Sequence, residues 1–134
     1  KLIVEWKGIR FCPLVCDDLR FPVWSRRSQK EDYDCLIYVA NWPAIRSDAW
    51  YSLLKARAIE NLSYVVGVNR VGVDGNDIVY DGKSVVFDFK GMAIDHHEIE
   101  KEGVSVQTID LESLNEFRSK FPADLDADQF EIIK

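Results

Sequence analysis

The chain has 134 residues, of which 47% are hydrophobic, and its formal net charge is −6. This length and composition are typical of one folded globular domain and exclude a disordered chain. The acidic balance argues against nucleic acid and anionic membranes as partners, because phosphate groups are bound by clustered Lys and Arg side chains. The sequence contains no apolar run of the ~18 residues that a membrane-spanning helix needs.

The hydrophobic periodicity predicts a series of short strands. The expected strands span residues 2–6, 9–15, 36–40, 64–71, 83–89, 91–98 and 104–109. Lys7-Gly8 separates the first two and fits a tight turn, so these strands are expected to form a hairpin. The run at 36–40 is apolar throughout, as in strands buried on both faces. Residues 72–82 are rich in Gly, Asp and Asn and predict a loop with a hairpin turn.

Two longer segments have the spacing of helices. One helix is expected over 48–62 with Ser47 as its N-cap, and another over 111–120 with Asp110 as its N-cap. A short helix is expected to begin at Pro22, because proline suits the first turn of a helix. The strands outnumber the helices, so part of the sheet must be antiparallel. The predicted fold class is therefore α/β (α+β), with one mixed sheet covered by helices.

The helix at 48–62 carries a charged residue on its apolar face. This face consists of Trp50, Leu53, Leu54, Arg57 and Ala58. A guanidinium that faces a core needs a partner, because an unpaired buried charge is costly. The sequence therefore predicts an acidic partner for Arg57, either Glu60 or an acid from another element.

Two further patterns concern the cysteines and the C-terminal tail. Cys12 and Cys35 lie inside apolar runs and are expected in the core, and an odd count of three cysteines fits a reducing, cytoplasmic compartment. Residues 123–134 form an acidic tail with apolar anchors at Phe130 and Ile132-Ile133. We expect this tail to pack on the core or on a partner subunit.

Cys16 lies where an apolar strand changes into a polar segment that starts a helix. This is the geometry of a nucleophile elbow, in which a side chain is presented at the carboxyl end of a strand. Backbone N–H groups of such a turn favour a thiolate, whereas the adjacent Asp17 and Asp18 oppose it. From chemistry alone, Cys16 is either a nucleophile or a buried strand cysteine.

Several spacings look like metal or phosphate motifs but do not satisfy them. Asp74 starts like a calcium loop, yet the following positions lack the required ligands and glycine. Gly82-Lys83-Ser84 lacks the first glycine of a phosphate-binding loop. The pair His96-His97 would point opposite ways on a strand. We therefore expect no metal and no cofactor.

Several motifs, in order, resemble those of the carbon–nitrogen hydrolase (nitrilase) superfamily. The resemblance runs from about Leu2 to Phe130 and within the superfamily points to bacterial ω-amidases. Its motifs are Val15-Cys16-Asp17-Asp18-Leu19-Arg20-Phe21-Pro22, Ala40-Asn41-Trp42-Pro43, Ala56-Arg57-Ala58-Ile59-Glu60-Asn61, Gly67-Val68-Asn69-Arg70-Val71-Gly72 and Asp74-Gly75-Asn76, together with Phe121-Pro122-Ala123 near the C-terminus.

The resemblance implies an amidase that acts on a small dicarboxylic monoamide. Cys16 would attack the amide carbonyl and form a thioester, and the backbone N–H of Asp17, with a lysine, would stabilise the oxyanion. A glutamate would act as general base, and Asn41, Trp42 and Pro43 would wall the substrate pocket. The resemblance also implies a homodimer or higher oligomer and structural roles for Arg57 and Glu60.

The resemblance also implies that this chain is the C-terminal half of the family's α–β–β–α sandwich. In the family, the base glutamate and the lysine lie upstream of the cysteine, whereas this chain begins at Lys1, without Met and already strand-like. We therefore expect residues 1–134 to be the C-terminal portion of one domain whose N-terminal half is absent. Asp17 stands where close relatives usually carry Tyr, and Ala49 replaces a frequent His. Asp17 keeps open an alternative, a noncatalytic domain with an assembly or regulatory role.

Overall fold

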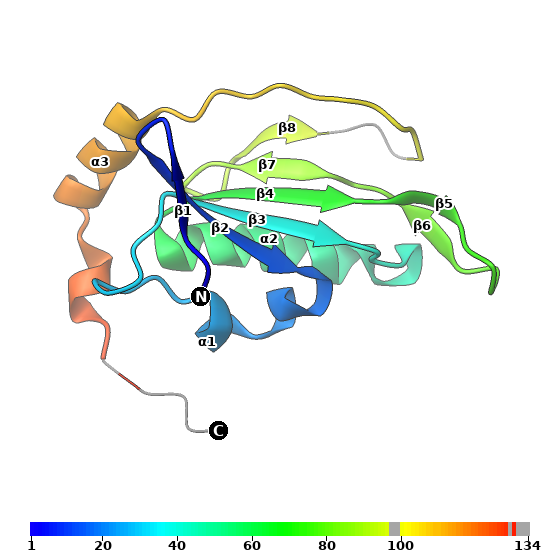
Figure 1. Ribbon diagram of the computed structural model, residues 1–134, viewed down its shortest axis with the longest axis horizontal. Coiled ribbons are helices and arrows are strands. Elements are labelled where there is room, and N and C mark those ends of the chain that lie inside the picture. The colour runs from blue at the N-terminus through cyan, green and yellow to red at the C-terminus, as the bar shows by residue number, and fades with distance from the viewer. Residues whose placement is uncertain (97–99, 129, 131–134) are drawn as a thin grey trace.

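A computed structural model describes residues 1–96, 100–128 and 130 of the chain. Its main sheet has the strand order β1-β2-β3-β4-β7-β8, and a separate hairpin is formed by β5 and β6 (Figure 1). The strands are β1 (Val4–Trp6), β2 (Ile9–Val15), β3 (Cys35–Ala40), β4 (Tyr64–Asn69), β5 (Val71–Val73), β6 (Val79–Asp81), β7 (Val85–Phe87) and β8 (Ala93–His96). The helices are α1 (Pro22–Ser25), α2 (Ser47–Asn61) and α3 (Leu111–Lys120), with short 3-10 turns η1 (Cys16–Arg20), η2 (Ala44–Arg46) and η3 (Ala123–Asp126).

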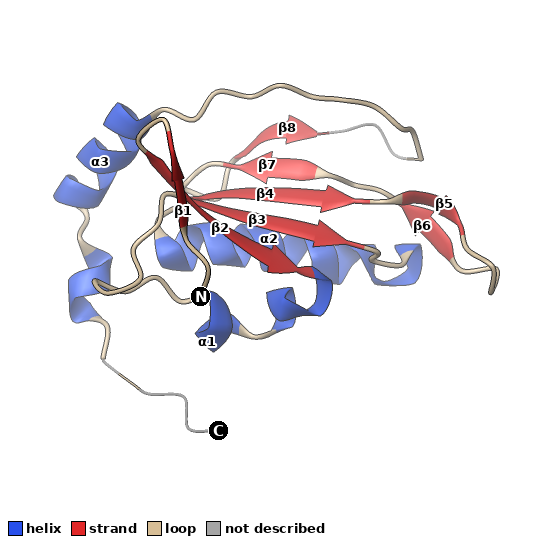
Figure 2. Cartoon of the chain, in the orientation of Figure 1, coloured by secondary structure: helices blue, strands red, loops and turns tan. Residues whose placement is uncertain are grey.

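The sheet is mixed, as its predicted fold class requires. Strands β2, β3 and β4 are mutually parallel, whereas β1, β7 and β8 each pair antiparallel with their neighbours. The β1–β2 pairing confirms the predicted hairpin around Lys7-Gly8, and both turn residues have positive φ. Figure 2 shows that α2 runs along one face of this sheet. No helix within the described part of the chain is long and apolar enough to cross a membrane.

The hydrophobic core lies between the sheet and α2. Trp50, Leu54 and Ala58 of α2 are fully buried, which confirms the apolar stripe expected for this helix. The helix approaches β4 closely at Gly67, where an added Cβ would meet side-chain atoms of Leu54 and lie 2.9 Å from the Trp50 ring. A glycine is required there because any side chain would occupy the volume that these two core residues fill.

The opposite face of the sheet is covered only in part. Because side chains alternate along a strand, the registered row Val15, Val39 and Val68 points away from α2. These valines are exposed by 62%, 49% and 48%. At the other end of the strands, α3 covers this face with Leu114 and Phe117. The row of valines is therefore an uncovered apolar strip at the carboxyl ends of the parallel strands.

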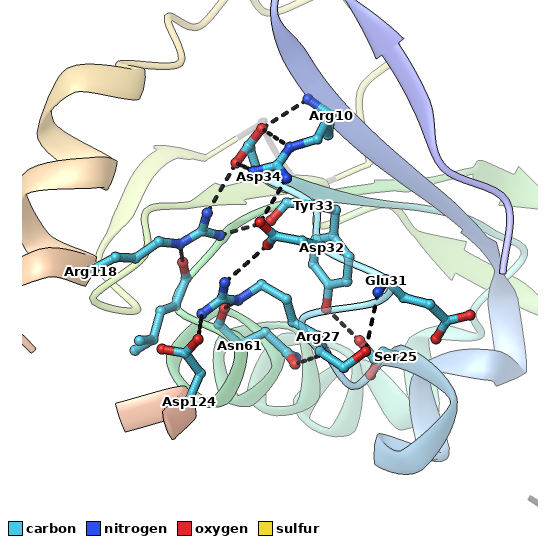
Figure 3. Close-up of polar contacts among 12 residues, drawn as sticks. Arg10, Ser25, Arg27, Glu31, Asp32, Tyr33, Asp34, Asn61, Arg118 and Asp124 are labelled. Carbon is cyan, nitrogen blue, oxygen red and sulfur yellow. Dashed lines mark hydrogen bonds and ion pairs between the residues drawn. The ribbon is translucent and has the colours of Figure 1, made fainter. Parts of the chain in front are cut away.

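Charged side chains fasten α3 to the amino-terminal ends of β2 and β3 (Figure 3). The carboxylate of Asp34 accepts hydrogen bonds from Arg10, at 3.0 and 3.2 Å, and from Arg118 of α3, at 3.0 Å. Asp34 is buried, so the two guanidinium groups compensate a charge that water does not reach. We define the ion cluster as Arg10, Arg27, Asp32, Asp34, Arg118 and Asp124.

Several sequence expectations differ from the structure; among them, the strand expected at 83–89 is reduced to β7. The strand expected at 104–109 is absent: Val104 and Val106 are 92% and 87% exposed, and the segment runs outside β8 without regular structure. Ser47 is the first residue of α2 rather than its N-cap, because its hydroxyl donates to Asp81 in β6 at 2.7 Å. The strand expected at 64–71 ends at Asn69, and Val71 starts the β5–β6 hairpin within the expected loop.

Other expectations are confirmed within the described residues. Helix α3 has the predicted bounds, and the Asp110 carboxylate accepts from the N–H of Ser113 at 3.0 Å. Strand β8 lies within the strand expected at 91–98, of which residues 97 and 98 lie outside the described residues. The tail anchor Phe130 is 53% exposed and is therefore not in the core of this chain. The other anchor, Ile132-Ile133, lies outside the described residues.

Candidate active site

The carboxyl ends of three parallel strands bring the predicted site segments to one edge of the sheet. Cys16 follows β2, Asn41 follows β3, and Asn69 ends β4. Figure 2 shows the arrowheads of these three strands at the same end of the sheet. Loops from neighbouring parallel strands meet at this edge, which is where α/β proteins commonly place ligands.

Cys16 has a backbone conformation that non-glycine residues rarely adopt. Its φ is 45°, in the left-handed region, and it begins the turn η1 directly after β2. Its side chain is half-buried, whereas Cys12 and Cys35 are fully buried, as the sequence predicts for core cysteines. A strained turn at a strand end is the conformation in which a nucleophile elbow presents its side chain.

The two carboxylates that follow Cys16 are both engaged. Asp18 accepts a hydrogen bond of 2.9 Å from the backbone N–H of Val15, and Asp17 accepts one of 2.8 Å from Arg20. The Asp17 side chain is 70% exposed. Water and these donors offset part of the negative charge that the sequence places beside the thiol.

A buried arginine supports this turn from α2. Arg57 pairs with Glu60 at 3.1 Å, which confirms the expected need for an acidic partner and identifies it. Its other nitrogen donates to the carbonyl oxygen of Leu19, in η1, at 2.6 Å. The sequence indicated the acid but not this carbonyl, because the contact joins residues 38 positions apart.

The predicted pocket residues follow β3 and differ in exposure. Asn41 is exposed, Pro43 is half-buried, and Trp42 is only 2% exposed. The Trp42 ring lies 5.5 Å from the Trp50 ring, and the guanidinium of Arg20 lies 4.6 Å from the Trp42 ring centroid. Cys16 packs against the same hydrophobic cluster that contains Trp42. The structure therefore brings the segment 41–43 and the cysteine turn together through Arg20 and the core.

Sequence reasoning gave no site role to Arg20 or Asn69. Asn69 is buried and its amide contacts the backbone of Trp42, so it belongs to this site. One signal could have identified it: Asn69 is a polar residue directly after the apolar run 64–68 of the strand expected at 64–71, as Asn41 is after 36–40, and adjacent strands end at the same edge.

A second polar cluster lies on the β5–β6 hairpin. The Tyr80 hydroxyl donates to Asp74 at 3.0 Å, which raises the pKa of Tyr80, and Arg70 lies 4.6 Å from the Tyr80 ring centroid. Asp74 also accepts from the N–H groups of Asn76 and Ile78, and these bonds lower its pKa. The carboxylate therefore stabilises a tight loop. Among the described residues, no three His, Cys, Asp or Glu side chains are grouped to hold a metal ion.

Known proteins are similar to this chain in both sequence and fold. The carbon–nitrogen hydrolase family model matches residues 2–119. Omega-amidase YafV of Escherichia coli (strain K12) is 51% identical over 132 residues, which are 98% of this chain and 51% of that protein. The 2-oxoglutaramate amidase of Bacillus subtilis (strain 168) is 36% identical over 119 residues, 88% of this chain and 45% of that protein.

A solved structure gives the same result for the fold. XC1258 from Xanthomonas campestris, a CN-hydrolase superfamily protein with an arsenic adduct in its active site, superimposes with a TM-score of 0.93 at 49% identity. The match covers 98% of this chain and 51% of that one, so the chain spans about half the length of the relatives it matches. The family model over residues 2–119 and these matches lead to one conclusion: the chain belongs to the carbon–nitrogen hydrolase family.

Proposed function

We propose that the protein is a cysteine-dependent amidase that hydrolyses the terminal amide of a small dicarboxylic monoamide, with Cys16 as its nucleophile. The observation that carries the proposal is the position of Cys16, half-buried in a left-handed turn at the end of β2, with the segment 41–43 after β3 at the same sheet edge. The relatives named omega-amidase and 2-oxoglutaramate amidase support the substrate class, of which 2-oxoglutaramate is an example.

The proposed reaction has two balanced steps. A general base takes the proton of the Cys16 thiol, the sulfur attacks the amide carbonyl, the C–N bond breaks, and the same group passes that proton to the nitrogen, which leaves as ammonia. Water, deprotonated by the same group, then attacks the thioester, releases the carboxylate and returns the proton to sulfur. The backbone N–H of Asp17 faces the developing oxyanion in this proposal, while Asn41, Trp42 and Pro43 wall the pocket. No cofactor takes part in these steps.

We also propose that residues 1–134 form the C-terminal portion of a single carbon–nitrogen hydrolase domain. Two observations support this proposal: the relatives are about twice as long as the matched region, and Val15, Val39 and Val68 form an uncovered apolar strip. A second sheet packed on this face would bury the strip and bring the base glutamate and the oxyanion lysine, which the family places upstream, to Cys16.

The alternative is a noncatalytic domain with an assembly or regulatory role, and Asp17 is the residue that favours it. An ammonia-release assay with glutaramate or succinamate separates the two proposals. We expect turnover from the complete domain, loss of turnover in Cys16→Ser, and no family-like rate from residues 1–134 alone. Loss of one oxyanion donor costs about 10²–10³ in rate, and loss of a general base about 10²–10⁴. A complete domain without turnover on any such amide contradicts the amidase proposal.

We further propose a homodimer or higher oligomer in the cytoplasm. The exposed Phe130, on an otherwise acidic tail, fits burial against a second subunit, and the free cysteines fit a reducing compartment. Light scattering of the complete protein, before and after deletion of residues 127–134, tests the assembly. This deletion keeps Asp124 and its 3.1 Å ion pair with Arg27. A monomer whose elution is unaffected by the deletion contradicts the proposed assembly.

A further inference from the structure

The side chain of Asn69 holds the backbone of Trp42 from both sides. Its Oδ1 accepts the N–H of Trp42 at 2.7 Å, and its Nδ2 donates to the Trp42 carbonyl at 3.0 Å. The same Nδ2 donates to the carbonyl of Gly82, between β6 and β7, at 2.8 Å. Asn69 is only 8% exposed, so these bonds are shielded from water.

Only an asparagine satisfies all three groups at this position. Its amide supplies one acceptor and two N–H donors, which match one backbone N–H and two carbonyl oxygens. An aspartate of the same shape keeps the acceptor but places its second oxygen against both carbonyls. A leucine of similar volume leaves all three buried backbone groups without partners, which costs about 1–3 kcal/mol for each group.

Asn69 also connects the pocket loop to the cysteine turn through Trp42. Arg20, four residues after Cys16, lies over the Trp42 ring, and the Trp42 Nε1–H donates to the carbonyl of Arg46 at 2.8 Å. The ring is therefore fixed on its face by Arg20 and at its edge by Arg46, while Asn69 fixes the backbone. A displaced Trp42 backbone would move the wall that the proposed pocket shares with the turn of Cys16.

We infer that Asn69 is a positioning residue, which sets the distance between the Trp42 wall and Cys16 and so determines how well the substrate is seated. This inference rests on the proposed amidase function. The hydrogen bonds of the Asn69 side-chain amide go to backbone groups of Trp42 and Gly82, and none of these bonds goes to Cys16. Replacing it should therefore weaken substrate binding and leave the intrinsic reactivity of the thiol unchanged.

Asn61 provides a matched control at the other end of the molecule. It is 1% exposed, its Oδ1 accepts the N–H of Arg27 at 2.8 Å, and its Nδ2 donates to the Arg57 carbonyl at 2.9 Å and to Glu60 at 3.4 Å. Asn61→Asp therefore disrupts a buried amide of the same kind, but one that holds α2 and the segment of Arg27 rather than the pocket loop.

The experiment compares Asn69→Asp and Asn61→Asp in the complete domain, with glutaramate as substrate. We expect KM to rise about tenfold or more in Asn69→Asp while kcat changes less than threefold, because a loss of about 1.4 kcal/mol in binding is a factor of ten. Asn61→Asp should keep the wild-type KM. Iodoacetamide should alkylate Cys16 at the same rate in the wild type and in Asn69→Asp.

A spectroscopic readout keeps the inference testable even without turnover. The Trp42 and Trp50 rings are 5.5 Å apart, so their coupled near-ultraviolet circular dichroism reports the position of Trp42. We expect this signal to change in Asn69→Asp and to stay the same in Asn61→Asp. If Asn69→Asp does not fold, Asn69→Ser, which keeps a smaller polar group, replaces it in both measurements.

The outcomes separate this inference from the proposed function. A wild-type domain without turnover contradicts the amidase proposal, and the dichroism comparison then decides the role of Asn69 by itself. A wild-type KM and an unchanged dichroism signal in Asn69→Asp overturn the positioning role. Equal changes in KM and dichroism in both variants overturn it as well, because they would show a general loss of stability.

Discussion

The guanidinium of Arg57, buried in α2, donates a 2.6 Å hydrogen bond to the carbonyl oxygen of Leu19, three residues after Cys16. Arg57 thus anchors the turn that carries the cysteine to α2. Its acidic partner, Glu60, lies on the same helix, and the two charged groups are 3.1 Å apart. A hydrogen bond from a charged group is among the stronger ones in a protein, about 1.5–3 kcal/mol. This contact therefore fixes the position of η1 relative to α2.

Arg57→Met should therefore destabilise the fold and loosen the cysteine turn. We expect the free energy of unfolding to fall by about 2–3 kcal/mol, because the Leu19 carbonyl and Glu60 both lose a charged partner. Urea denaturation followed by circular dichroism measures this change. Arg46→Met is the control, since that side chain is exposed, and its unfolding free energy should stay within about 0.5 kcal/mol of wild type. Equal losses in both variants would contradict the role of Arg57.

Cys16 should react with iodoacetamide faster than the other two cysteines. Cys12 and Cys35 are fully buried, and burial raises the pKa of both thiols, that of Cys35 to about 12. Cys16 is half-buried at the turn, so its sulfur meets the reagent first. Peptide mass spectrometry over a time course identifies the alkylated residue. In the complete domain, loss of activity should follow the labelling of Cys16; prior labelling of Cys35 with activity retained would falsify the assignment.

The ion cluster should make stability depend on acid pH. Burial acts to raise the pKa of Asp34, but hydrogen bonds from Arg10 and the charges of Arg10 and Arg118 outweigh it, so the pKa lies below its ordinary value. A carboxyl with a lowered folded-state pKa stabilises the protein above its unfolded-state pKa of about 3.9. That contribution is lost as the pH falls through the lower folded-state value.

Urea midpoints measured from pH 7 to pH 3 test this dependence. We expect the wild-type midpoint to fall below about pH 4 and the midpoint of Asp34→Asn, already lower at pH 7, to show a shallower acid decline. The exposed Asp128→Asn serves as the control and should follow the wild-type curve. Parallel wild-type and Asp34→Asn curves across this range would exclude Asp34 as the titrating group.

Gly67→Ala should destabilise the protein although it adds a single methyl group. The new Cβ would overlap Leu54 and lie 2.9 Å from the Trp50 ring, both fully buried, so the helix or its side chains must move. Overpacking of this kind costs about 1–3 kcal/mol. Gly75→Ala is the matched control, because a Cβ there has no neighbour within 4 Å. Thermal denaturation of the two variants should show a lower midpoint for Gly67→Ala alone.

The elements that the sequence predicts well are those with local signals. Helix α3 has the expected bounds because Asp110 caps it through Ser113, three residues away. Strand β2 also has the expected bounds, since a turn and a change in polarity delimit it. The segment at 104–109 alternates like a strand, but Val104 and Val106 remain exposed because strand formation needs a pairing partner that alternation alone cannot supply.

In the candidate site, too, the sequence predicts some features and not others. The positions of Cys16 and Trp42 follow from motifs that are contiguous in sequence, and the structure brings both to one sheet edge. The contacts that hold them come from distant residues: Arg57 reaches Leu19 over 38 positions, and Asn69 reaches Trp42 over 27. Such contacts depend on the completed packing of α2 and β4, so no local pattern in the sequence specifies them.

The pairing of Arg118 with Asp34 has a consequence for synthesis of the chain. The two residues are 84 positions apart, so at about 5–20 residues per second a ribosome makes Arg118 roughly 4–17 s after Asp34. Two arginines, Arg10 and Arg118, pair with Asp34 in the folded protein, and during that interval only Arg10 of these two has been made. A product that ends before residue 118 has one of the two guanidinium groups that pair with the Asp34 carboxylate. Quality-control proteases should therefore degrade such early-terminated products faster than the finished chain.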